Sequence, residues 1–127
     1  MKTNVTFPAL AVVMIGAIVA PTLTVAQHKA PKAAPLSFAK DIGPAMTKAC
    51  AGCHTGAKAP KGLDLSSYAG VMKGAKGGVK VIVPGHPDKS ILVGTLHGKP
   101  ILMPPKKALD KKTITMVELW VKQGAKK

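Results

Sequence analysis

The chain has 127 residues, with 19 Lys and Arg against 5 Asp and Glu, a formal net charge of +14. This length suits one small domain, and aromatic residues make up only 3% of it, which indicates that a non-protein group fills part of the interior. Every basic residue is Lys, and no basic stripe is interleaved with aromatic residues, so nucleic acid is excluded as an expected partner.

Residues 1–26 have the features of a secretory signal peptide. A lysine precedes the apolar run 9–20, and small residues then suit cleavage before Gln27. This predicts export to the periplasm. The alternative is an uncleaved membrane anchor, which needs about 20 apolar residues. Pro8 and Pro21 shorten the apolar run and favour cleavage.

Residues 27–37 are rich in Ala, Pro and Lys and show no hydrophobic periodicity, so a flexible leader is predicted. The folded domain is then residues 38–127. Its first helix is expected to start with Asp41 as the N-cap and Pro44 in the first turn, and to run to about His54.

Both cysteines lie in the pentapeptide Cys50-Ala51-Gly52-Cys53-His54. A disulfide across a two-residue spacer closes almost no loop and stabilises little. A zinc site needs about four ligands, and no second Cys pair or suitably spaced His pair follows. A redox-active pair of the thioredoxin type requires a βαβ context, whereas this chain offers Gly- and Pro-rich loops with short helices.

Covalent attachment of haem accounts for all three chemically active residues of the pentapeptide. The thiols of Cys50 and Cys53 each form a thioether with one vinyl group of the porphyrin, and His54 then lies beneath the iron. The motif therefore predicts one haem c, with two covalent links and His54 as the proximal iron ligand.

Three further helices are expected after a loop rich in Gly and Pro. A short helix covers part of residues 66–74, and the next begins at Asp88 or Ser90 and ends before Gly98. The last helix has the clearest signals: Asp110 as N-cap, and Gly124 just after its end. Its apolar face comprises Ile114, Val117, Trp120 and Val121.

Several segments, taken together and in order, resemble a known family. They are DIGPAMTKACAGCH, GLDLSSYAGVMKG, VIVPGHPDKSILVGTL, ILMPP and ELWVKQGA. They are similar to small cytochrome c domains common in planctomycetes and related bacteria, in which Gly-Leu-Asp-Leu, Val-Pro-Gly and Met-Pro-Pro recur in this order. The resemblance covers about residues 38–125. It implies an all-α cytochrome c fold, with about four short helices and long Gly- and Pro-rich loops wrapped around one covalently bound haem.

Met103 is the expected second axial ligand of the iron. It precedes two prolines, which restrict the backbone and can hold a thioether rigidly, and the resemblance implies the same residue. His97, near a helix end, is the rival ligand, whereas His86 lies in a turn and is expected to be exposed. The other methionines of the domain have the helical spacing typical of core residues: Met46, Met72 and Met116.

The resemblance also implies a role for Pro60, whose carbonyl would accept a hydrogen bond from the second ring nitrogen of His54 and fix its tautomer. Because large side chains are few, we expect that the domain does not fold without haem. The side chains left to line the haem are Leu63, Leu65, Tyr68, Ile82, Val83, Ile91, Leu92, Leu96, Ile101 and Leu102.

These features predict a periplasmic electron-transfer protein that carries single electrons on a haem with His/Met axial ligation. No arrangement of acids, bases or nucleophiles supports an enzyme. The alternative is a haem-based enzyme or gas binder, such as a peroxidase, with an open sixth coordination site, which requires that Met103 does not bind iron. The sequence does not separate a free carrier from an electron-transfer subunit of a larger oxidoreductase.

The excess of lysine predicts acidic redox partner proteins, because its field steers negatively charged surfaces and weakens with salt. We expect docking through Lys58, Lys61, Lys106 and Lys107, beside the haem edge. An anionic membrane surface is a second candidate partner. The chain is expected to act as a monomer.

Overall fold

The computed structural model describes residues 33–127, so the predicted signal peptide and the first part of the predicted leader lie outside the described residues. Within this part the chain is helical, as predicted, and apart from one isolated bridge between Ala75 and Val79 it has no β-structure. None of its helices has the length and apolar character needed to cross a membrane.

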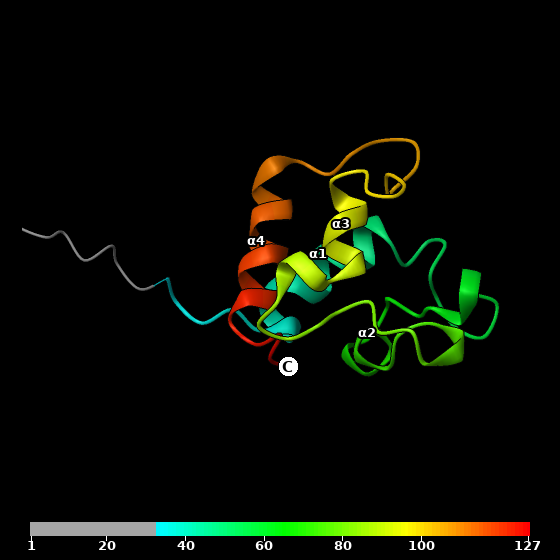
Figure 1. The fold of residues 1–127 in the computed structure, drawn as a ribbon, viewed down its shortest axis with the longest axis horizontal. Coiled ribbons are helices and arrows are strands. Elements are labelled where there is room, and N and C mark those ends of the chain that lie inside the picture. Colours follow the sequence, from blue (N-terminus) through cyan, green and yellow to red (C-terminus); the bar gives the residue numbers. More distant parts are fainter. Residues whose placement is uncertain (1–32) are drawn as a thin grey trace, which may run out of the picture. The chain divides into compact units, whose positions relative to one another are not determined.

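Four α-helices follow one another along the described chain (Figure 1). They are α1 (Gly43–Ala49), α2 (Tyr68–Lys73), α3 (Ile91–Leu96) and α4 (Lys111–Lys122). A π-helical turn, Phe38–Ile42, leads into α1, and three single 3₁₀ turns lie in the loops: Pro60–Gly62, Lys76–Gly78 and Pro87–Lys89. The long connections between these short elements agree with the predicted loop-rich, all-α architecture.

The first helical segment begins earlier and ends earlier than predicted. Ser37, and not Asp41, is the N-cap: its hydroxyl accepts a hydrogen bond from the backbone N–H of Lys40 (3.3 Å), while Oδ2 of Asp41 accepts from the N–H of Ser37 (2.8 Å). This reciprocal capping starts the segment at Phe38. The segment ends with α1 at Ala49, because the backbone leaves the α-helical pattern at Cys50 and the N–H of Ala51 bonds to the Met46 carbonyl five residues back (3.2 Å).

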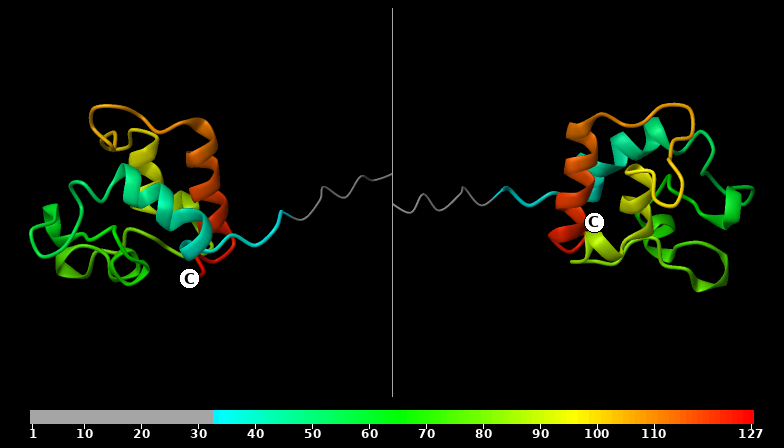
Figure 2. Two further views of the ribbon diagram at one scale, coloured as in Figure 1. Left: turned by 180° about the vertical axis from the view of Figure 1, so that it is seen from behind. Right: turned by 45° about the horizontal axis from the view of Figure 1, so that its top comes forward.

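The C-terminal helix α4 has the predicted caps. Oδ1 of Asp110 accepts a hydrogen bond from the N–H of Thr113 at 2.9 Å, and Gly124 follows the helix with φ of +100°. Trp120 is fully buried, lies 5.8 Å from the ring of Phe38, and donates from Nε1 to the Lys126 carbonyl at 2.8 Å. The first and last helical segments therefore meet through these two aromatic rings, and both views of Figure 2 draw the two segments side by side.

The Asp110 cap predicts a pH-dependent contribution to stability. Hydrogen bonds from the Thr113 hydroxyl and then from its N–H lower the pKa of Asp110. Because the folded pKa is below the unfolded one, this stabilisation is present at neutral pH and is lost as pH falls below the ordinary value of 3.8. We expect Asp110→Ala to lower Tm by about 5 °C at pH 7. The difference from wild type should shrink in acid; a constant difference from pH 7 to pH 3 in calorimetry would contradict the charge contribution.

The end of the predicted leader contacts the domain. Gln123, just after α4, accepts a hydrogen bond from the N–H of Leu36 (2.7 Å) and donates to the carbonyl of Ala34 (3.2 Å). The N–H of Phe38 is bonded to the Lys126 carbonyl at 3.0 Å. Contact with the folded domain therefore begins at Ala34, ahead of the predicted boundary at Phe38.

Candidate functional site

A cavity of about 500 Å³ opens beside α1 and α3 and has mostly apolar walls. Four stretches of chain form these walls: residues 49–54, 60–65, 91–96 and 103–105, with Val81 completing one side. The first stretch carries the Cys-x-x-Cys-His motif and the last carries Met103. The fold thus brings two distant sequence motifs to one apolar space.

The motif itself folds as a tight turn directly after α1. The Cys50 carbonyl accepts from both the N–H of Cys53 (3.1 Å) and the N–H of His54 (2.9 Å), which places all three side chains at the cavity wall. No disulfide joins the two cysteines: Cys50 is half-buried and Cys53 is exposed. Burial raises the pKa of the Cys50 thiol, which is opposite to the lowered pKa of reactive thiols in redox-active Cys-x-x-Cys pairs.

The ring of His54 is oriented by a backbone carbonyl. Its Nδ1 lies 3.2 Å from the carbonyl oxygen of Leu63. Since a carbonyl only accepts, Nδ1 carries the hydrogen and Nε2 keeps its lone pair free for a metal. The His54 carbonyl in turn accepts from the N–H of Leu65 at 2.8 Å, which ties the motif to the end of the loop.

The resemblance implied that the Pro60 carbonyl accepts the hydrogen bond from the His54 ring, and this prediction is wrong. The Pro60 carbonyl accepts from the N–H of Leu63 at 3.1 Å, because the turn Pro60–Gly62 directs it into its own backbone. Pro60 still lines the cavity. The carbonyl that lies beside Nδ1 of His54 therefore belongs to Leu63, three positions after Pro60 in the same loop.

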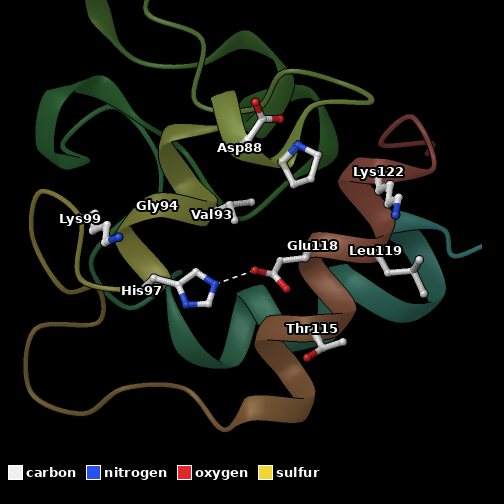
Figure 3. A pocket seen from close by; sticks show the side chains of 10 residues that line it. Asp88, Val93, Gly94, His97, Lys99, Thr115, Glu118, Leu119 and Lys122 are labelled. Carbon is white, nitrogen blue, oxygen red and sulfur yellow. Dashed lines mark hydrogen bonds and ion pairs between the residues drawn. The ribbon is translucent and has the colours of Figure 1, made fainter.

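Met103 lies at the cavity wall, whereas the rival His97 does not. The Met103 N–H donates to the Thr95 carbonyl of α3 at 2.9 Å, which fixes the loop beside the cavity. The His97 ring is half-exposed and points instead into a groove between α3 and α4, where Nε2 lies 2.5 Å from Oε1 of Glu118 (Figure 3). The structure thus brings Met103 together with the Cys-His motif, and iron ligation by Met103 stays a prediction.

Residues 50–107 match the family described as planctomycete cytochrome C. They form a planctomycete-type cytochrome c domain. No curated protein and no solved structure matches the chain. The matched region starts at Cys50 and includes His54, Pro60, His97 and Met103, while α1 and α4 lie outside it. Membership of this family indicates a haem-binding domain of the electron-transfer class.

The residues of the cytochrome c domain fit a covalently bound haem. Two free thiols, an imidazole with a free Nε2 and a thioether share one apolar cavity of a size typical for cofactors. Among residues 33–127, no cluster of three or more His, Cys, Asp and Glu side chains could hold another metal ion. The zinc interpretation of the two cysteines therefore lacks a ligand set in this part of the chain.

The other methionines of residues 33–127 and the turn histidine lie where the sequence predicts. Met46 is buried in the core, Met72 and Met116 are partly buried against it, and His86 is exposed. None of the four lines the cavity. The interpretation of helically spaced methionines as core residues is confirmed.

Half of the side chains that were predicted to line a haem line this cavity. Five of the ten side chains line the cavity: Leu63, Leu65, Ile91, Leu92 and Leu96. Tyr68 instead packs edge-on against Phe38 at 5.6 Å and donates to the Ala125 carbonyl at 3.0 Å. Thr95 is a wall residue that the sequence analysis missed, although it follows Ile91 at the helical spacing of four.

Proposed function

We propose that the chain is a periplasmic electron-transfer protein that carries single electrons on one covalently attached haem c. The observation that supports this best is that Cys50, Cys53, His54 and Met103 line one and the same apolar cavity. When bound there, the haem supplies a one-electron couple that the protein's own side chains lack.

Each residue has a distinct role in this proposal. Cys50 and Cys53 hold the group covalently, and the Leu63 carbonyl keeps Nε2 of His54 in the form that binds iron. Met103 is the sixth ligand, and the apolar walls limit access of water. His/Met ligation and low solvent access both raise the reduction potential.

Visible spectra of the purified, haem-loaded protein in both oxidation states test this proposal. His/Met ligation gives a low-spin spectrum in both states, with a weak absorption near the red edge in the ferric form. A high-spin ferrous form that binds carbon monoxide readily would instead indicate the haem-based enzyme or gas binder. N-terminal sequencing tests export separately, because cleavage leaves a mature chain that starts at Gln27.

We also propose that the protein acts as a monomer and docks acidic redox partners through lysines beside the cavity. Lys58, Lys61, Lys106 and Lys107 are exposed, and they flank or belong to two of the stretches that form its walls, residues 60–65 and 103–105. An anionic membrane surface is the alternative partner, which sedimentation with vesicles of phosphatidylglycerol would detect.

Because these lysines are positively charged, we expect them to speed the reaction of the haem-loaded protein with anionic oxidants and to slow its reaction with cationic ones. For Lys61→Glu/Lys106→Glu, we expect oxidation of the ferrous protein by ferricyanide to slow on the order of tenfold at low salt. Oxidation by a cationic cobalt(III) hexaammine complex should become faster. The matched control is Lys112→Glu/Lys122→Glu, which makes the same charge change at exposed positions of α4. Equal slowing by both double variants would contradict docking at the cavity.

A further inference from the structure

The loop that carries Met103 folds back on the last turn of α3. The N–H of Lys99 donates to the Gly94 carbonyl at 2.8 Å, and the N–H of Met103 donates to the Thr95 carbonyl at 2.9 Å. The Thr95 carbonyl also accepts from the N–H of Gly98 at 3.1 Å. Both ends of the loop 98–103 are therefore bonded to adjacent residues of one helical turn, so the position of that turn sets the position of Met103.

Gly94 allows this close return. A glycine inside a helix is unfavourable because its backbone loses more freedom than that of other residues. A Cβ at position 94, however, would lie 2.8 Å from the backbone oxygen of Lys99, closer than real Cβ contacts. A larger residue must therefore push the loop away from α3, and Met103 lies at the end of that loop.

The same end of α3 is joined to α4 by one side-chain pair. Nε2 of His97, the residue directly after α3, lies 2.5 Å from Oε1 of Glu118, and Figure 3 shows the two side chains pointing toward each other across the groove. Glu118 belongs to a helix whose opposite face is buried in the core through Val117 and Trp120. Three further charged residues line the groove, Asp88, Lys99 and Lys122, and none of them is hydrogen-bonded or ion-paired to His97 or Glu118.

We propose that Gly94 and the His97–Glu118 pair are positioning residues for Met103. This inference rests on the proposed function, in which Met103 is the sixth ligand. A thioether competes with other ligands for iron, and it competes better when its loop is already held in the bound position. Gly94 holds the loop against α3, and the His97–Glu118 pair holds the end of α3 against α4.

The experiment measures how easily Met103 is displaced in the purified haem-loaded protein. The ferric form is titrated with imidazole, and exchange of the Met103 amide hydrogen is followed in parallel. We expect apparent imidazole affinity to rise on the order of tenfold in Gly94→Ala. In His97→Ala and Glu118→Ala it should rise about two- to fivefold, because the pair is half-exposed. The hydrogen of the Met103 amide should also exchange faster, most in Gly94→Ala and less in His97→Ala and Glu118→Ala.

Two variants separate positioning from a general loss of stability. His97→Gln keeps a side-chain N–H donor for Glu118 and should behave nearly as wild type. Lys122→Ala removes a charged side chain from the same groove and helix without touching His97, and should leave imidazole affinity unchanged. Equal effects of Lys122→Ala and His97→Ala would overturn the proposal, as would unchanged affinity and exchange in His97→Ala and Glu118→Ala.

Met103→Ala distinguishes failure of this inference from failure of the proposed function. If it leaves imidazole affinity unchanged, Met103 is not the sixth ligand and the His/Met proposal fails with it. If it raises the affinity strongly while the His97 and Glu118 variants do not, only the positioning role fails. Should Gly94→Ala not fold, the His97 and Glu118 variants still decide the question.

Discussion

We expect the replacement of both Cys50 and Cys53 by alanine to yield a chain that carries no covalent haem and lacks a stable fold. The apolar cavity would then stay unfilled or take up water. At about 24 cal/mol per Å³, its volume of about 500 Å³ corresponds to at most about 12 kcal/mol. The whole free energy of unfolding of a domain is about 5–15 kcal/mol, so a loss near this upper bound would remove the native state. Haem staining on denaturing gels and helix content by circular dichroism measure the two effects.

Gly52→Ala is the control for this loss. Position 52 lies between the two cysteines, and an added Cβ there would meet no other atom within 4 Å. We therefore expect normal haem attachment and an unchanged melting transition. A double cysteine variant that shows no haem stain but melts cooperatively, with native-like helix content, would contradict the idea that the fold depends on the cofactor.

Met103→Ala is expected to leave the fold intact and to change the iron site. Its side chain is only partly buried and faces the cavity rather than the core cluster. The ferric spectrum should lose its weak absorption near the red edge, and the ferrous protein should gain carbon monoxide binding. The reduction potential should fall by on the order of 0.1 V, within the roughly 0.8 V range that axial ligation covers.

Met116→Leu is the matched control, because Met116 is partly buried against the core and does not line the cavity. It should leave the spectrum and the potential unchanged. If Met103→Ala behaves in the same way, another group occupies the sixth position. A wild-type ferrous protein that already binds carbon monoxide would favour the haem-based enzyme or gas binder.

The features that could be predicted from the sequence are those with local causes. The Asp110 cap and Gly124 act within one helical turn of their own positions, and the burial of Trp120 follows from the spacing of the apolar face of α4. The Cys-x-x-Cys-His motif is likewise contained in a single turn. For the helix cap and for the Cys-x-x-Cys-His turn, neighbouring residues alone determine the geometry.

The features that could not be predicted depend on distant parts of the chain or on the exact course of a loop. Which carbonyl meets His54 is decided by how the turn Pro60–Gly62 folds, and this turn uses the Pro60 carbonyl internally. Tyr68 packs in the core and not at the cavity, because it contacts Phe38 and Ala125, which lie near the two ends of the domain sequence. The partner of His97 on α4 has no signal in the sequence around either residue.

The hydrogen bonds between Gln123 and residues 34–36, together with that from Phe38 to Lys126, join both ends of the described chain next to Trp120. These residues form no part of the cavity wall. A pulling force applied at residue 34 would therefore act first on the hydrogen bonds to Gln123 at the end of α4, and it would not act directly on the loop that carries Met103. For the same reason, an affinity tag or surface linker joined at the C-terminus, which Figure 2 marks, would be attached beside Trp120 and not at the cavity wall.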